Sequence, residues 1–401
     1  MVFRLRPDVS VQMQAMTAID PVSFAQALIR CPSVTPEDHG ALETLQNALA
    51  PIGFSFHRLR FEDAKSAAVD NLYARIGTDA PHFCFAGHTD VVPVGERNSW
   101  RHDPFGAVIE NGVLYGRGAA DMKSAIAAFT AAASDHLGKH PPKGSISLLI
   151  TGDEEGVGIN GTPKMLGWLK QHGEVIDHCL VGEPTSSAKA GDVIKIGRRG
   201  SMNFVATVKG IGGHAAYPQL ALNPVPIAAE LVRRISAWKL DDGSEWFEPS
   251  TLAFTMIDAG NRAVNVIPQQ VRAGFNIRFN DRQTPDALLR HITQMTNEVK
   301  QALGGELTVE HSVSGVSFIT RPGEFTGLLS KAVTGVNGAP PEFSTSGGTS
   351  DARFIKDHCP VAELGLPGRT MHKLDEAVAV EDITRLARIY ESILDLYFAA
   401  Q

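Results

Sequence analysis

Cysteines are scarce in this chain, and no two of them are closely spaced. Among 401 residues there are four, Cys31, Cys84, Cys179 and Cys359, and none forms the C-x-x-C spacing typical of metal and redox sites. Cys84 and Cys179 lie in apolar runs, HFCFAG and HCLVGEP, where a small buried hydrophobic side chain is the expected role. The cysteines therefore predict neither disulfides nor thiolate ligands, and they are typical of a reducing cytoplasm.

Long apolar runs and an excess of positive charge are also missing. No run approaches the roughly 18 apolar residues of a membrane span, and the first residues, MVFRLRPDVSVQMQAM, lack the apolar core of a signal peptide. Lysine and arginine number 37 against 44 acidic residues, a net charge of −7, which argues against a nucleic-acid surface. We therefore expect a soluble, cytoplasmic protein with no nucleic-acid or membrane partner.

The N-terminal segment, residues 1–19, is expected to be a disordered leader. The first clear helix signal is Asp20 followed by Pro21, because aspartate is a good N-cap and proline suits the first helical position. Met16 would also serve as a start site.

Helix and strand patterns alternate from Asp20 to about Arg199. The second expected helix ends near Gly53, and the last is rich in alanine with an apolar stripe. This alternation predicts an α/β domain with a central sheet, and sites in such sheets lie at the carboxyl ends of the strands. The expected helices are 20–31, 38–50 and 123–137, and the expected strands are 54–61, 71–77, 82–87, 145–150 and 178–182.

A different order follows in the middle of the chain. The pattern predicts strand 202–209, helix 224–238, strands 251–258 and 270–279, helix 285–303 and strand 306–313. This βαββαβ order is the ferredoxin-like split unit. A chain of 401 residues with 43% hydrophobic residues suits two domains. We therefore expect a discontinuous catalytic domain, 1–199 and 313–401, with a second domain, 200–312, inserted into it.

Five residues able to ligate metal lie in short Gly- or Pro-marked segments that follow strand-like runs. They are His88, Asp121, Glu155, Glu183 and His372. Two imidazoles and three carboxylates without a thiolate suit a pair of divalent ions such as zinc. Glu154 stands beside one ligand and is placed to handle protons. This combination indicates a hydrolase that activates water on two metals.

Each motif taken alone also has a structural explanation. In GHTDVVPV, Asp90 can accept the far ring N–H of His88, or the two are a loop histidine and a surface acid. In GRGAADMK, Asp121 can bridge two metals or cap the next helix. TGDEEG can hold a ligand beside a base or be a solvated acidic loop, although adjacent acids repel each other without cations. Together the motifs favour a metal site.

The order of these motifs resembles the dinuclear zinc deacylases, a family that includes aminoacylase, acetylornithine deacetylase and glutamate-releasing carboxypeptidases. The resemblance runs from about residue 20 to the C-terminus. It implies two zinc ions per chain, replaceable by cobalt or another divalent ion, a homodimer, and an inserted domain that acts in dimerisation or as a lid. It also implies that Glu154 is the general base. In the implied ligand sets, one zinc is held by His88, Asp121 and Glu183, and the other by Asp121, Glu155 and His372, with Asp121 bridging.

Further segments narrow the resemblance within the family. They are VGEPTS, GRRGSM, GGHAAYP, NVIP and SGGTSDARF. The last offers backbone N–H groups for a substrate carboxylate, and the rival phosphate loop is disfavoured because no Gly-Lys-Ser/Thr follows. By the resemblance, His214 reaches from the lid of one subunit into the site of the other and helps to hold the oxyanion.

Two arginines are candidates to hold substrate carboxylates, because a planar guanidinium suits them. Arg198 and Arg278 match family positions, and surface ion pairing is the alternative role. Two departures from close relatives are visible: Val264 precedes Asn265 in place of asparagine, and Gly368 stands where asparagine is common. Neither is a ligand. The further substrate-binding candidates are Ser201, Asn265, Gly347, Gly348 and Thr349.

The resemblance implies hydrolysis of a small N-acyl amino acid. The several separate anion holders favour an acyl group that carries its own carboxylate, because an acetyl group would leave some of them unpaired. Deacylation of another N-acyl amino acid, such as acetylornithine, is one alternative. A catalytically idle relative that binds metal or a partner is another, although the intact pair Glu154–Glu155 argues against it.

Overall fold

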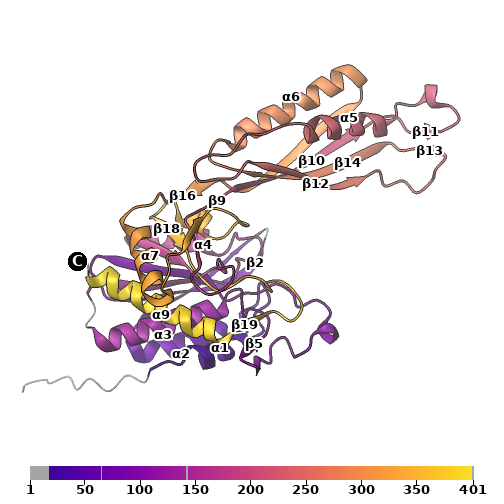
Figure 1. Ribbon diagram of the computed structural model, residues 1–401. Coiled ribbons are helices and arrows are strands. Elements are labelled where there is room, and N and C mark those ends of the chain that lie inside the picture. The colour runs from indigo at the N-terminus through magenta and orange to yellow at the C-terminus, as the bar shows by residue number, and fades with distance from the viewer. Residues whose placement is uncertain (1–17, 65, 141–142, 400–401) are drawn as a thin grey trace, which may run out of the picture. The chain divides into compact units, whose positions relative to one another are not determined.

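The computed structural model describes residues 18–64, 66–140 and 143–399 (Figure 1). Most of the expected leader, Met16 included, lies outside these ranges. The described residues form two compact units: unit 1 lies within the bounds Met1–Ile194, Pro322–Glu342 and His358–Gln401, and unit 2 within Lys195–Arg321 and Phe343–Asp357. Among the described residues, no helix is long and apolar enough to cross a membrane.

Unit 1 is built on an eight-stranded sheet with the order β1-β2-β6-β3-β7-β18-β8-β17, in which the last residue of β8 and the last two of β17 belong to unit 2. Strand β3 runs parallel to both β6 and β7, and β18 runs parallel to β7, whereas β1 and β2 add an antiparallel edge. The strands are β1 (Ser55–Asp63), β2 (Ser66–Ile76), β3 (His82–His88), β6 (Ser145–Thr151), β7 (His178–Val181), β8 (Val193–Lys195), β17 (Glu342–Ser344) and β18 (Val361–Glu363).

Helices cover both faces of this sheet. Phe85 on β3 stacks on Phe129 of α3 at 4.3 Å between ring centroids and meets Tyr390 of α9 edge-on. The strand register turns Tyr73 of β2 to the opposite face, where its ring lies 5.9 Å from Trp168 of α4. The helices of unit 1 are α1 (Pro21–Ile29), α2 (Ala41–Leu49), α3 (Lys123–Lys139), α4 (Thr162–Gln171), α7 (Glu324–Asn337) and α9 (Val380–Ala399).

Helices α1, α2 and α3 and strands β1, β2, β3, β6 and β7 were predicted, whereas α4, β8 and β17 were not. The segment of α4, TPKMLGWLKQ, has a glycine in its interior and few apolar residues, so the periodic signal is weak. A small three-stranded sheet of order β19-β5-β4 completes unit 1. Its strands are β4 (Val108–Glu110), β5 (Val113–Tyr115) and β19 (Ala377–Ala379).

Unit 2 contains an antiparallel sheet of order β12-β14-β10-β15, to which α5 and α6 contribute a helical layer (Figure 1). Along the chain these elements follow the βαββαβ order, which confirms the predicted ferredoxin-like unit. They are β10 (Gly200–Lys209), α5 (Pro224–Ser236), β12 (Thr251–Asp258), β14 (Gln270–Phe279), α6 (Pro285–Leu303) and β15 (Glu306–Gly315).

The core of unit 2 lies between this sheet and the two helices. Phe204 on β10 and Phe275 on β14 are paired in register and stack at 4.9 Å between centroids. Leu231 of α5 and Ile292 of α6 belong to the same buried cluster. Burial of each such side chain contributes roughly 1.5–3 kcal/mol. The remaining elements of unit 2 are β9 (Gly197–Arg198), β11 (Gly213–His214), β13 (Val266–Ile267), β16 (Phe318–Ile319) and α8 (Ala352–Ile355).

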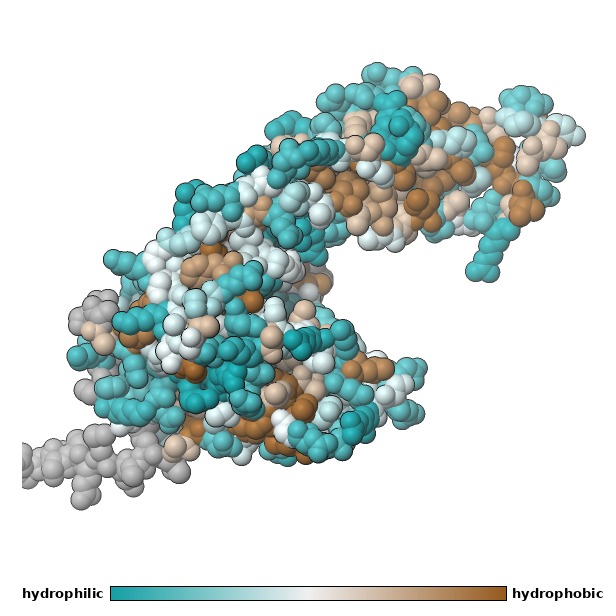
Figure 2. Space-filling view, viewed as in Figure 1, coloured by the Kyte–Doolittle hydropathy of each residue, from teal (hydrophilic) through white to brown (hydrophobic). Residues whose placement is uncertain are grey.

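Apolar side chains are also exposed on unit 2. Figure 2 shows brown surface gathered along the visible face of the unit that carries β12 and β14. Met256 and Ile257 of the edge strand β12 are exposed, the latter to 63%. An edge strand with apolar side chains is a surface that can pair with another chain.

A buried histidine makes the stability of unit 1 depend on pH. His82 begins β3, with Nδ1 2.7 Å from the carbonyl oxygen of Val175 and Nε2 2.7 Å from the hydroxyl of Ser147. Burial lowers the pKa of His82 below its ordinary value. The unfolded chain therefore binds the proton more readily, so this contribution to stability is present above a pH of about 6.5 and is lost as the pH falls below it.

Replacing His82 by asparagine should therefore flatten the acid side of the stability profile. Between pH 7 and pH 5 the free energy of unfolding of the wild type should fall more steeply than that of His82→Asn, by up to about 1.4 kcal/mol per pH unit. Urea unfolding at several pH values measures the difference. His57→Asn, a substitution of an exposed histidine on β1, is the matched control and should keep the wild-type slope. Parallel slopes for wild type and His82→Asn would contradict the assignment.

Candidate metal centre and active site

Six of the predicted residues come together in unit 1, at the carboxyl ends of its parallel strands. His88 is the last residue of β3, Glu154 and Glu155 follow β6, and Glu183 follows β7. Because β3, β6 and β7 are parallel neighbours, their carboxyl ends meet at one edge of the sheet. The other two residues come from further segments: Asp121 precedes α3, and His372 lies in the turn before β19.

The carboxylate of Asp121 lies between the two histidines. Its Oδ1 is 3.2 Å from Nε2 of His88, and its Oδ2 is 3.3 Å from Nε2 of His372. The N-cap of α3 is Met122 and makes no side-chain capping bond, so Asp121 does not serve the capping role that its position allowed. Burial alone would raise the pKa of Asp121, but hydrogen bonds from His372 and His88 lower it below its usual range.

His372 lies beside Asp121 and Glu155, on the Oδ2 side of the Asp121 carboxylate. Its Nε2 is 2.9 Å from Oε1 of Glu155, and its backbone has a positive φ of 62°. Hydrogen bonds to Asp121 and Glu155 raise the pKa of His372 to about 10. The carboxylates around this ring therefore attract positive charge strongly, and a divalent cation would supply that charge.

Glu183 and Glu154 complete the part of the cluster that contains His88. Oε1 of Glu183 is buried, has no hydrogen-bond partner and lies 3.7 Å from Nε2 of His88. Burial, and then the charges of Asp121 and Glu154, raise the pKa of Glu183 well above its ordinary value. A buried carboxylate oxygen without a partner is costly, and a bound cation would remove that cost.

Two overlapping groups of ligand atoms, which share His88, are each compact enough to hold an ion. The atoms of His88, Asp121 and Glu155 lie within 4.8 Å of one another, and so do those of His88, Glu154 and Glu183. Imidazole nitrogen and carboxylate oxygen are ligands of zinc and similar divalent ions. The donor atoms and the unpaired oxygen of Glu183 therefore fit a metal centre.

The structure corrects the expected partner of His88. The carboxylate of Asp90 was expected to accept the ring N–H, but Nδ1 of His88 lies 2.9 Å from the backbone oxygen of Asp90 and 3.6 Å from its Oδ1. The carboxylate instead accepts the backbone N–H groups of Glu154 and Glu155 at 3.3 and 3.1 Å, and the hydroxyl of Thr35 at 2.7 Å. The short segment after β3 places the Asp90 carbonyl closer to the ring, so Asp90 orients both His88 and the acidic loop.

Sequence reasoning missed a buried ion pair that orients Asp121. Oε1 of Glu376 accepts the backbone N–H groups of Ala120 and Asp121 at 2.9 and 3.1 Å, and its Oε2 pairs with Arg117 at 2.7 Å. Both side chains are almost fully buried, so removal of one partner would leave an unpaired charge. Glu376 lies 255 residues after Asp121, and nothing in its segment LDEAVAV marks it as a contact of that loop.

Unit 2 holds all the predicted substrate-binding residues, and one group of them clusters near β9 and β10. Nη1 of Arg198 donates to the carbonyl of Gly348 at 3.2 Å, and a Cβ added at Gly347 would lie 2.5 Å from the same nitrogen. Ser201 is paired in register with Arg278 across β10 and β14. Thr349 is half-buried.

Arg278 is the residue of this group with unused hydrogen-bonding capacity. Its Nη1 is buried without a hydrogen-bond partner. Burial, and then the nearby charge of Arg199, lower its pKa. A buried guanidinium nitrogen without a partner beside a second cation is a favourable place for an anion.

The remaining pair of predicted residues belongs to a separate ribbon of unit 2. His214 on β11 pairs in register with Val266 on β13, and the carbonyl of Asn265 accepts the N–H of Ala215 at 2.9 Å. Both His214 and Asn265 are exposed. Within unit 2, β11 and β13 lie at the end opposite β9 and β16 (Figure 1), so these residues do not join Arg198 and Arg278.

Comparison with known proteins decides the family. The model of peptidase family M20/M25/M40 matches residues 84–396, more than half of the chain. The chain belongs to peptidase family M20/M25/M40. Membership makes it a hydrolase and confirms the resemblance to the zinc deacylases, a metal-dependent family.

Members of the M20/M25/M40 family with curated functions are similar over nearly the whole chain. The succinyl-diaminopimelate desuccinylase of Parvibaculum lavamentivorans is 55% identical over 95% of this chain and 96% of its own length. The enzyme of the same name from Rhodospirillum centenum is 55% identical over 95% of this chain and 98% of its own.

Solved structures share the fold. A tripeptidase from Staphylococcus aureus has a TM-score of 0.78 and 21% identity, covering 97% of this chain and 100% of its own. A dinuclear metal-binding peptidase of the M20 family from Bacillus subtilis has a TM-score of 0.69 and 15% identity, covering 94% and 98%. At these identities the likeness concerns the fold alone.

Proposed function

We propose that this protein is a di-zinc amide hydrolase that removes the succinyl group from N-succinyl-LL-2,6-diaminopimelate. The products are succinate and LL-2,6-diaminopimelate, a precursor of lysine and of the cell wall. The observation that carries the proposal is the position of Asp121, whose two oxygens face two separate histidines in a chain 55% identical to desuccinylases. The four cysteines of the chain are unpaired, which suits a reducing cytoplasm.

The ligand sets that we propose are those implied by the family resemblance, and the contacts of Asp121 with both histidines support them. His88, Asp121 and Glu183 would hold one ion, and Asp121, Glu155 and His372 the other, with Asp121 serving both. Bound there, two zinc ions would polarise the scissile carbonyl and lower the pKa of a water molecule.

The protein groups then divide the proton transfers between them. Glu154 takes a proton from the attacking water as the new carbon–oxygen bond forms at the amide carbonyl. The carbon–nitrogen bond breaks when Glu154 delivers that proton to the departing amine. Asp90 holds Glu154 in place through its backbone N–H, and Glu376 holds the loop of Asp121.

The substrate contacts are proposed for unit 2. Arg278 offers an unpaired buried nitrogen, and Arg198 with the Gly347–Gly348–Thr349 segment offers a second place for a carboxylate. Ser201 and Asn265 are further contacts. His214 is proposed to stabilise the oxyanion in the site of a second copy of the chain, and the exposed apolar edge of β12 supports a homodimer formed through unit 2.

A panel of N-acyl amino acids tests the choice of substrate. Succinyl carries a carboxylate that acetyl lacks, so an acetyl substrate leaves buried donors unpaired, at a cost of roughly 1–3 kcal/mol. We expect kcat/KM for the succinyl amide to exceed that for acetylornithine by roughly 10- to 100-fold. Equal or higher kcat/KM on acetylornithine would contradict the desuccinylase assignment while leaving the di-zinc deacylase intact.

Arg278 should account for part of this preference. Arg278→Ala should raise KM or lower kcat for the succinyl substrate and leave the zinc content unchanged. Arg272→Ala, which removes an exposed arginine from the same strand, is the matched control and should behave as the wild type. Loss of zinc in Arg278→Ala, or equal effects of the two substitutions, would contradict a role in substrate binding.

A further inference from the structure

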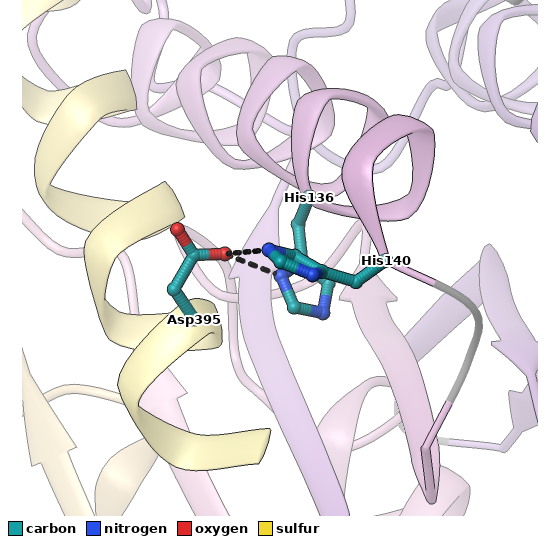
Figure 3. A group of neighbouring side chains, drawn as sticks. All are labelled: His136, His140 and Asp395. Atoms are coloured by element: carbon teal, nitrogen blue, oxygen red, sulfur yellow. Dashed lines mark hydrogen bonds and ion pairs between the residues drawn. The ribbon is translucent and has the colours of Figure 1, made fainter. Parts of the chain in front are cut away.

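A third group of potential ligands lies in unit 1, between α3 and α9. His136 and His140 are four residues apart at the end of α3, and Asp395 comes from α9 (Figure 3). Nδ1 of His136 is 2.7 Å from Oδ1 of Asp395, and Nε2 of His140 is 3.7 Å from the same oxygen. Neither the proposed reaction nor the six residues of the metal centre uses this group.

The geometry is close to that of a metal site. One ligand atom from each residue lies within 4.8 Å of the other two. In a tetrahedral zinc site with bonds of about 2.0–2.2 Å, ligand atoms are about 3.3–3.5 Å apart, a value bracketed by the two separations to Asp395. Figure 3 shows both imidazoles and the carboxylate turned toward one another, so small side-chain adjustments suffice.

The solvent exposure of the three side chains is also compatible with a bound ion. The side chain of His136 is 4% exposed, whereas His140 and Asp395 are 54% and 39% exposed. One ligand is therefore held firmly by packing, its ring tilted against Phe398 at 5.6 Å between centroids. The other two face solvent and leave the remaining coordination position open to water.

The surrounding charge favours a cation. Lys139 forms an ion pair with Glu391, and Asp135 and Asp395 lie near the same ammonium group. Three carboxylates thus act electrostatically on a single ammonium group. Both histidines stand at the carboxyl end of α3, where the unpaired carbonyl groups of a helix also attract cations.

We propose that His136, His140 and Asp395 bind a further divalent ion of the zinc type, outside the catalytic centre. Two imidazole nitrogens and one carboxylate oxygen select a borderline cation such as Zn²⁺ over Ca²⁺ or Mg²⁺, which prefer oxygen ligands. The ion joins the last turn of α3 to α9, the two helices that also pack on β3 beneath the catalytic centre. Its role is structural, since no side chain of the group touches the six residues described above.

Zinc stoichiometry tests the site. Tag-free full-length protein is first loaded with zinc so that the catalytic centre is filled, and is then dialysed against rising concentrations of free zinc with metal analysis of both compartments. The wild type should take up one zinc ion more per chain than His140→Ala or Asp395→Asn. His172→Ala, which removes an exposed histidine from the C-cap of α4, is the matched control and should keep the extra ion.

Two further measurements separate the site from general effects of the substitutions. His140→Ala should retain the wild-type kcat and circular dichroism spectrum, because the ring of His140 is exposed and takes no part in the proposed reaction. The additional zinc should raise the Tm of the wild type and of His172→Ala, but not that of His140→Ala, because an ion that binds only the folded state stabilises it. Equal zinc uptake by wild type and His140→Ala would overturn the proposal, and so would an extra ion that survives both substitutions.

Discussion

Glu154→Gln should lose kcat by about 10²–10⁴-fold while it retains its zinc. Glutamine keeps the shape of glutamate and can still be held by the Asp90 carboxylate through its backbone N–H, but it cannot accept a proton. The attacking water then loses its base, and the departing amine loses its proton donor. Steady-state kinetics together with metal analysis on the same preparation measures both quantities.

The neighbouring residue provides the matched comparison. Glu155→Gln changes an adjacent carboxylate by the same single group, but Glu155 contacts His372 at 2.9 Å and is a proposed ligand. It should therefore lose metal as well as activity, whereas Glu154→Gln should lose activity alone. Near-normal turnover of Glu154→Gln with full metal content would show that another group deprotonates the water.

Asp121→Ala should remove more zinc than any other single ligand substitution. Its Oδ1 faces His88 and its Oδ2 faces His372, so one truncation takes a ligand from both proposed ions. Glu183→Ala and Glu155→Ala should each weaken one ion more than the other. Metal analysis after dialysis against a weak chelator measures the retained zinc, which should be up to two ions in the active centre of the wild type.

An acid outside the centre controls for the loss of a carboxylate. Asp79 is exposed in the loop before β3, and Asp79→Ala should keep the metal content of the wild type. Retention of both catalytic ions by Asp121→Ala would contradict the bridging role. Activity of that variant should fall with its zinc, and added zinc should restore little of it because the ligand itself is missing.

Local signals in the sequence were sufficient for most elements of the fold. In unit 2, β12, β14 and α6 have the predicted bounds, since Thr284 and Pro285 mark the start of α6 and the hydroxyl of Thr284 accepts the N–H of Ala287. The inserted βαββαβ order follows from the spacing of such signals. The interior glycine of α4 weakened its periodic pattern, and that helix escaped prediction.

The candidate site was predictable to the extent that strand ends mark it. His88 ends a buried strand, Glu155 and Glu183 follow two others, and parallel strands bring such residues to one edge. Which atoms meet depends on the paths of the loops, and this is why the partner of His88 proved to be the carbonyl of Asp90. The contact of Glu376 with Asp121 spans 255 residues and leaves no local signal.

The metal dependence of amide hydrolysis tests the central claim most directly. Protein stripped of metal by a chelator should be inactive on N-succinyl-LL-2,6-diaminopimelate, and stepwise addition of zinc should restore the release of succinate as the catalytic centre fills. Asp121→Ala should not recover activity under the same titration. Undiminished turnover by fully metal-free protein, or no turnover of any N-acyl amino acid by the zinc-loaded enzyme, would contradict the claim.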